Sequence, residues 1–72
     1  MTSPHLEKRF GSIAVEQGFI TIDQLTRAMN IQILENVEKK SHRLIGEILL
    51  DLGFITRPQI DQVVKSLVKN PY

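Results

Sequence analysis

Histidines, carboxylates and cysteines are the side chains that most often carry out catalysis or bind metals, and this 72-residue chain offers few useful arrangements of them. It has no cysteine, and its two histidines, His5 and His42, stand 37 positions apart. A zinc site needs several such ligands close together, so this spacing predicts no metal site. The eight acidic residues are scattered, and no glycine-rich phosphate loop accompanies them. We therefore expect no catalytic residue and no enzymatic activity.

Charge and hydropathy exclude further classes of protein. Nine Lys and Arg residues against eight Asp and Glu give a net charge of +1, which is too balanced for a non-specific nucleic-acid binder or a polybasic membrane anchor. No apolar run is long enough to cross a bilayer. The charged N-terminal region also lacks the apolar stretch of a signal peptide. We expect a single cytoplasmic domain that spans residues 1–72.

The elements of this domain follow from an internal repeat with an offset of 35 residues. Residues 10–21 align without gaps on residues 45–56. Seven of the twelve aligned pairs are identical or both acidic: Gly11/Gly46, Ile13/Ile48, Glu16/Asp51, Gly18/Gly53, Phe19/Phe54, Ile20/Ile55 and Thr21/Thr56. Such self-similarity is typical of two copies of one structural unit. We expect repeat 1 at about residues 6–39 and repeat 2 at about residues 42–69.

Each copy predicts a helix, a glycine, a turn and a second helix. Gly18 and Gly53 stand where a left-handed residue would end the first helix. Thr21 and Thr56 each precede a glutamine by three positions, which is the spacing of a capping box at the start of the second helix. The predicted fold is all-α, with four short helices that form two repeated helical hairpins and pack as a small bundle.

Apolar residues at helical spacing predict the inner face of each helix. In the first helices they are Leu6, Phe10, Ile13 and Ala14, and Ile45, Ile48, Leu49 and Leu52. In the second helices, expected at residues 22–39 and 58–69, the apolar residues on one face are Leu25, Ala28, Met29, Ile33 and Val37, with the polar Gln32 among them, and Ile60, Val63, Val64, Leu67 and Val68. Ser41 is the candidate N-cap of the third helix.

The repeat is similar to a known motif. The residues that carry the similarity are Arg9-Phe10-Gly11, Val15, Gly18-Phe19-Ile20, Leu25, Met29 and Gln32. They resemble the repeat in the N-terminal domain of type II secretion and type IV pilus assembly ATPases, the GspE-type or MshEN-like domain. The family pattern runs from Arg-Leu-Gly through a pair of aliphatic residues and a Gly with two more aliphatics to Leu, Leu and a final Gln. The resemblance covers about residues 8–67.

The two copies match this pattern unequally. The first keeps both polar ends, Arg9 and Gln32. The second has Leu44 at the arginine position and Leu67 at the glutamine position. Arg43 lies one residue before the arginine position, and its long side chain can reach the same place. The fold signal is therefore present twice, and the polar ends of the motif are complete in one copy.

The resemblance implies a ligand site, because the best-understood relatives bind cyclic di-GMP with one motif on each half of the dinucleotide. The implied first half-site consists of Arg9, Gly11, Gly18 and Gln32. The implied second, weakened half-site consists of Gly46, Gly53 and Arg43. An arginine can pair with a phosphate or a guanine edge, and a glutamine can both donate to and accept from guanine. The two mid-helix glycines also fit close helix packing, and the sequence leaves both explanations open.

The same resemblance implies a second function, which is docking of a protein. Such N-terminal domains hold a membrane-platform protein of the secretion or pilus machine. The incomplete second motif favours protein docking over cyclic di-GMP binding. A third alternative is a DNA-binding helix-turn-helix, but Arg27 and Asn30 on its recognition helix are accompanied by Asp23 and Glu35. We therefore expect no DNA partner, no membrane insertion and no cofactor other than cyclic di-GMP as a possible ligand.

Overall fold

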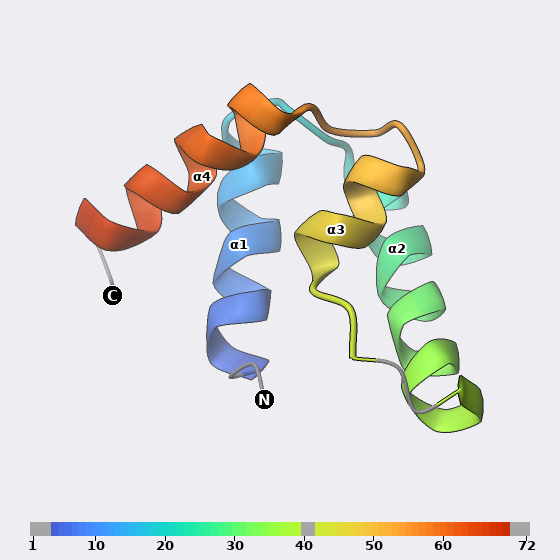
Figure 1. The fold of residues 1–72 in the computed structure, drawn as a ribbon. Coiled ribbons are helices and arrows are strands. Elements are labelled where there is room, and N and C mark those ends of the chain that lie inside the picture. The colour runs from blue at the N-terminus through green and yellow to red at the C-terminus, as the bar shows by residue number, and fades with distance from the viewer. Residues whose placement is uncertain (1–3, 40–41, 70–72) are drawn as a thin grey trace.

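The computed structural model describes residues 4–39 and 42–69, and every regular element within these ranges is helical (Figure 1). The elements are α1 (Pro4–Glu16), α2 (Ile22–Leu34), the π-helical turn η1 (Glu35–Lys39), α3 (Ile45–Asp51) and α4 (Arg57–Lys69). The predicted all-α bundle of four helices is confirmed. The long second helix expected at residues 22–39 is α-helical only as far as Leu34 and ends in η1.

Both first helices end in the same way, at a glycine in the left-handed region. The φ angles of Gly18 and Gly53 are 79° and 77°. The N–H of the next residue then donates to a carbonyl five residues back, from Phe19 to Ala14 at 2.9 Å and from Phe54 to Leu49 at 3.0 Å. These bonds complete a Schellman motif, as the repeat predicts.

Both second helices begin with the predicted capping box. The N–H of Thr21 donates to Oε1 of Gln24 at 2.9 Å, and the N–H of Gln24 donates to Oγ1 of Thr21 at 3.1 Å. The corresponding distances for Thr56 and Gln59 are 3.0 and 3.3 Å. Each box satisfies two backbone groups that would otherwise lack a partner at a helix start.

The start of α3 differs from the prediction. Ser41 lies outside the described residues, and the N-cap position belongs to Leu44, with φ −73° and ψ 152°. A leucine side chain cannot accept a hydrogen bond. The carboxylate of Glu47 instead accepts the N–H of Leu44 at 3.2 Å. The helix therefore begins at Ile45, about three residues later than expected, and has half of a capping box.

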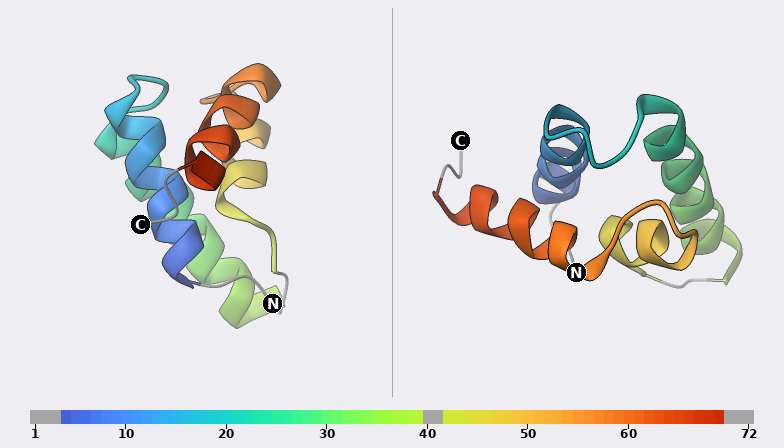
Figure 2. Two further views of the ribbon diagram at one scale, coloured as in Figure 1. Left: turned by 90° about the vertical axis from the view of Figure 1, so that its left-hand side faces the viewer. Right: turned by 90° about the horizontal axis from the view of Figure 1, so that it is seen from above.

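The main helix contacts join the two repeats. α1 packs chiefly against α4 and α3 chiefly against α2, and α1 also contacts α3 and α2. Gln17, which directly follows α1, also donates a hydrogen bond from Nε2 to Oγ of Ser66 in α4, at 2.9 Å. The loops that join α1 to α2 and α3 to α4 lie at the same end of the molecule (Figure 2). Each hairpin therefore depends on the other for most of its packing.

The core follows the repeat closely. Its nine buried hydrophobic residues are Phe10, Ala14, Ile20, Ala28, Ile45, Ile48, Leu49, Ile55 and Val63. Eight of these nine form four pairs at the offset of 35 residues: Phe10/Ile45, Ala14/Leu49, Ile20/Ile55 and Ala28/Val63. Phe19 and Phe54 are partly buried against this cluster. Burial of equivalent positions in both copies explains why the repeat is preserved so clearly at apolar positions.

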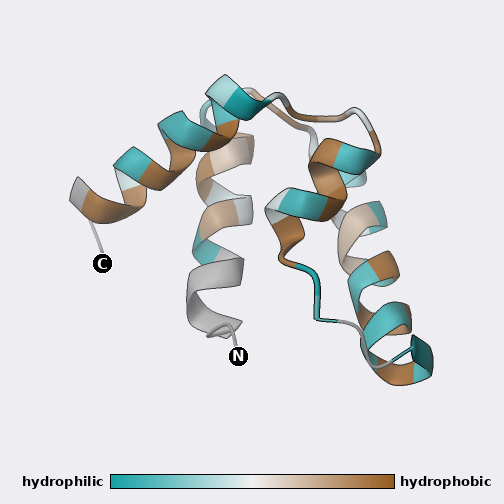
Figure 3. Ribbon diagram, in the orientation of Figure 1, coloured by the Kyte–Doolittle hydropathy of each residue, from teal (hydrophilic) through white to brown (hydrophobic). Residues whose placement is uncertain are grey.

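Several apolar residues that were expected on the inner faces are exposed, so this part of the prediction is wrong. The exposed fractions are 38% for Met29, 58% for Ile33, 73% for Val37, 37% for Leu52, 44% for Val64 and 76% for Val68. The apolar face of each second helix is wider than the surface that its neighbours cover. Figure 3 shows this on α4, where hydrophobic residues follow one side of the helix along its length.

Candidate functional site

The polar residues of the first motif lie on different helices. Arg9 is half-buried on α1, and Gln32 is half-buried on α2. The amide of Gln32 donates from Nε2 to the backbone carbonyl of Arg43 at 3.1 Å. Gln32 is therefore already in contact with the segment that leads into α3. The structure thus brings together one residue from each of the two expected half-sites, Gln32 and Arg43.

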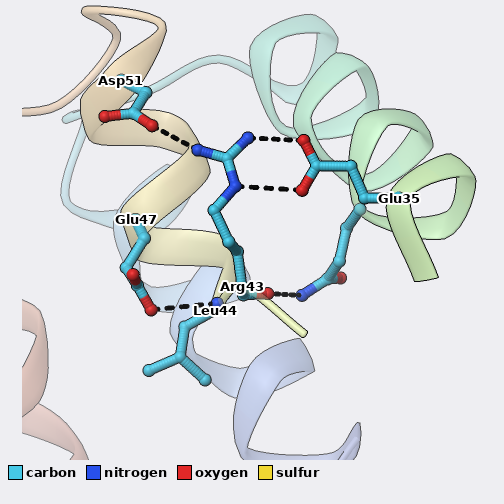
Figure 4. A network of polar contacts seen from close by, with 6 residues as sticks. Glu35, Arg43, Leu44, Glu47 and Asp51 are labelled. Atoms are coloured by element: carbon cyan, nitrogen blue, oxygen red, sulfur yellow. Dashed lines mark hydrogen bonds and ion pairs between the residues drawn. The ribbon is translucent and has the colours of Figure 1, made fainter. Parts of the chain in front are cut away.

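The side chain of Arg43 binds two carboxylates, one on each side of its guanidinium group (Figure 4). Nε donates to Oε1 of Glu35 at 2.9 Å, and the second terminal nitrogen, Nη2, donates to Oε2 of Glu35 at 2.6 Å. Nη1 donates to the carboxylate of Asp51. A bidentate pair of this kind is among the stronger hydrogen-bonded contacts that an arginine can make.

The hydrogen bonds from Arg43 hold the pKa of Glu35 below its ordinary value of 4.5. The charge of Arg43 adds to this effect, while partial burial of the carboxylate opposes it. In turn, the hydrogen bonds to Glu35 raise the pKa of Arg43. The guanidinium group of Arg43 is therefore already bound to two carboxylates of the protein itself. It would have to leave Glu35 and Asp51 before it could act as the arginine of the expected second half-site.

The mid-helix glycines lie where helices approach closely. A Cβ atom added to Gly11 would lie 2.8 Å from Cδ1 of Leu25, and one added to Gly46 would lie 3.1 Å from Cζ of Phe10. Both distances are shorter than ordinary carbon contacts. Helix packing therefore accounts for these two glycines, without a ligand. Gly18 and Gly53 serve as helix ends, and nothing lies within 4 Å of an added Cβ.

An open groove of about 330 Å³ lies in the second repeat, between α3 and α4, with Phe10 of α1 beside them. We call it the second-repeat groove. Its lining residues are Phe10, Leu44, Ile45, Gly46, Glu47, Leu50, Arg57, Ile60, Val64 and Leu67. Seven of them, from Leu44 to Leu67, stand at motif positions of the second copy. The groove is almost entirely apolar, with Glu47 and Arg57 as its two charged residues.

The groove forms because the two helices of a repeat pack against each other differently in the two copies. In the first repeat, Leu25 of α2 lies against Gly11 of α1. In the second repeat, the nearest atoms to the equivalent Gly46 belong to Phe10 of α1, and α3 makes little direct contact with α4. Phe10 of the first repeat thus occupies the place beside Gly46 that a residue of α4 would take by analogy with Leu25. The space between α3 and α4 therefore stays open.

Sequence reasoning identified Leu44 and Leu67 as departures from the motif but did not find the surface that they form. Both leucines line the second-repeat groove at the positions where the family pattern has Arg and Gln. Glu35 and Asp51 were missed as partners of Arg43. The one signal for them was the acidic pair Glu16/Asp51 within the repeat, which does not indicate an arginine partner.

Residues 4–39 and 42–69 contain no group of three or more His, Asp or Glu residues that could hold a metal ion. None of the helices in these two ranges has the length and the apolar character that a bilayer crossing requires.

Comparison with known proteins yields no match to a protein-family model, a curated protein or a solved structure.

Proposed function

We propose that this chain is a non-catalytic protein-docking module that receives apolar side chains of a partner protein in the second-repeat groove. The observation that carries the proposal is the replacement of both polar ends of the motif by leucines, Leu44 and Leu67, which line the groove. Burial of aliphatic or aromatic side chains in an apolar groove is energetically favourable. It offers little to the polar edge of a guanine base, whose desolvation would be uncompensated.

The state of Arg43 supports the same conclusion. This arginine is the nearest substitute for the missing polar end, and it is held by Glu35 and Asp51. A nucleotide that used Arg43 as its polar contact at the second repeat would first have to break that network. Docking of an apolar side chain leaves the network intact.

The resemblance of the repeat to secretion and pilus ATPase domains supplies the partner for this proposal. We infer that the partner is a membrane-platform protein of such a machine and that the module binds to the cytoplasmic side of that protein. For this reason we place the module in the cytoplasm. A partner helix with aliphatic residues at positions i, i+3 or i+4, and i+7 would suit a groove between two helices.

The test is an NMR titration of the ¹⁵N-labelled chain with the cytoplasmic domain of the platform protein from the same organism. We expect saturable shifts at groove residues, centred on Leu44, Gly46 and Ile60. Leu44→Lys should abolish them, because it places a charge in the apolar groove. Leu34→Lys is the matched control, because Leu34 is 55% exposed on α2 and does not line the groove. Binding that is unchanged in Leu44→Lys, or no binding at all, would contradict the proposal.

Cyclic di-GMP sensing is the second candidate, because the first copy keeps Arg9 and Gln32 of the motif. Under this alternative, one complete motif would hold the dinucleotide and the second copy would contribute apolar contacts. The two candidates predict different ligands, so they can be separated by direct titration.

A further inference from the structure

The C-terminal half of α4 exposes apolar residues beyond the helix on which it packs. α4 contacts chiefly α1, and its C-terminal end extends away from the other helices (Figures 1 and 2). Val64 is 44% exposed and Val68, one turn later, is 76% exposed. Together with Ile60, which is partly buried, they form a stripe at positions i, i+4 and i+8. We call Ile60, Val64 and Val68 the α4 stripe.

The charges beside the α4 stripe are arranged symmetrically along the helix. Asp61 and Lys65 are both exposed, and they lie two residues before and two residues after Val63. Residue 63 is also the midpoint of α4, which runs from Arg57 to Lys69. When two α4 helices pair antiparallel about this midpoint, Asp61 of each faces Lys65 of the other. The complete length of both helices overlaps in the same arrangement.

We propose that the α4 stripe is an interface between two copies of this chain, with the two α4 helices antiparallel and two Asp61–Lys65 ion pairs across a twofold axis. A twofold interface requires one surface that is complementary to itself. The α4 stripe and its flanking acid and base meet this requirement. This inference goes beyond the proposed function, although Ile60 and Val64 of the α4 stripe also line the second-repeat groove.

α2 also has exposed apolar residues, Met29 and Ile33, but it does not meet the same requirement. Its neighbouring acid and base, Asp23 and Arg27, are centred on residue 25, whereas the midpoint of α2 is residue 28. An antiparallel pair that joined these charges would overlap only the N-terminal halves of the two helices. Charge complementarity therefore favours α4 over α2 as the place where a second copy binds.

The proposal is tested by sedimentation velocity of the chain from micromolar to millimolar concentration. We expect a reversible monomer–dimer equilibrium. Val68→Lys should raise the dissociation constant by about tenfold or more, because it buries a charge in the interface. Ile33→Lys is the matched control, because Ile33 occupies the equivalent position of repeat 1 and is 58% exposed. It should leave the dissociation constant within about twofold.

A charge exchange tests the orientation of the helices. Asp61→Lys and Lys65→Asp should each weaken self-association, because each places like charges opposite each other. An equimolar mixture of the two variants should associate again, because every facing pair in the mixed dimer has opposite charges. Circular dichroism confirms that each variant is folded. A monomer at millimolar concentration, or a mixture that associates no better than the single variants, would overturn the proposal.

The outcomes for pairing and docking are distinguishable. Val68 does not line the second-repeat groove, whereas Leu44 does and lies outside α4. A monomeric chain that still binds the platform protein through Leu44 overturns the pairing alone. A chain that pairs through Val68 but does not bind that protein overturns only the proposed partner.

Discussion

Glu35 and Arg43 form a two-bond ion pair that ties the end of α2 to the segment that leads into α3. The two distances are 2.9 and 2.6 Å, and Arg43 also binds Asp51 at the other end of α3. α3 has seven residues and no side-chain hydrogen bond from its N-cap residue. The Arg43 network therefore fixes a short helix at both of its ends. It also connects the first repeat to the second.

The Glu35–Arg43 pair predicts a pH dependence of stability. Since the pKa of Glu35 is lowered in the folded protein, the pair stabilises the fold above the unfolded pKa. The contribution is lost as the pH falls below about 4.5 and through the folded pKa. We expect the difference in unfolding free energy between the wild type and Glu35→Gln to be constant near neutral pH and to shrink in acid. Urea denaturation at a series of pH values measures this difference.

Glu38→Gln is the control for this experiment, because Glu38 is exposed on the same turn, η1. It should leave the acid limb of the stability curve unchanged. A Glu35→Gln variant whose stability runs parallel to that of the wild type down to the acid transition would contradict the role given to the ion pair.

The glycines that end α1 and α3 predict a backbone effect on stability. Gly18→Ala and Gly53→Ala should each lower the unfolding free energy by about 1–2 kcal/mol, because alanine is strained at positive φ. An added Cβ meets no atom within 4 Å at either position, so crowding does not contribute. The asparagine variants should lose less, since asparagine tolerates this region better. Equal losses for Ala and Asn in chemical denaturation would show that φ is not the cause.

The two capping boxes predict that loss of either threonine hydroxyl lowers the unfolding free energy by a similar, small amount. Thr21→Ala and Thr56→Ala each remove the hydroxyl that accepts the backbone N–H of the following glutamine. Each should cost about 1 kcal/mol in the unfolding free energy. Thr26→Ala, on the exposed face inside α2, should be neutral or slightly stabilising. A loss at Thr26 as large as at Thr21 would mean that the cap is not responsible.

Leu49, the fully buried leucine of α3, predicts the largest loss of unfolding free energy among these variants. Leu49 is 0% exposed, and Leu49→Ala should cost about 2–5 kcal/mol, through lost burial and the cavity that remains. In a domain of this size, that is a large part of the total stability. Leu34→Ala, with the same change of side chain at a 55% exposed position, should change stability by no more than about 0.5 kcal/mol. Thermal unfolding of both variants provides the comparison.

Local features of this fold could be predicted from the sequence because each depends on a few adjacent residues. The glycine helix ends and the threonine caps are set by φ angles and by bonds over three to five residues. Three of the four core pairs, Phe10/Ile45, Ala14/Leu49 and Ala28/Val63, consist of residues that helical periodicity placed on inner faces.

Features that depend on distant residues could not be predicted in the same way. Helical periodicity placed Ile33 and Val68 on an apolar face, but exposure depends on how far the neighbouring helix extends. The insertion of Phe10 beside Gly46, which leaves the second-repeat groove open, joins residues 36 positions apart. Arg43 lies outside the repeat pattern, so no spacing rule indicated its contact with Glu35.

The most direct test of the central claim, that the second repeat docks protein side chains in place of a nucleotide, is an NMR titration of the ¹⁵N-labelled chain with cyclic di-GMP, with GMP as the control. We predict no saturable shift at millimolar ligand, because leucines occupy both polar positions of the second motif. Saturable shifts at Arg9, Gly11, Gln32 and Gly46 that disappear in Arg9→Ala would contradict the account and identify a nucleotide sensor.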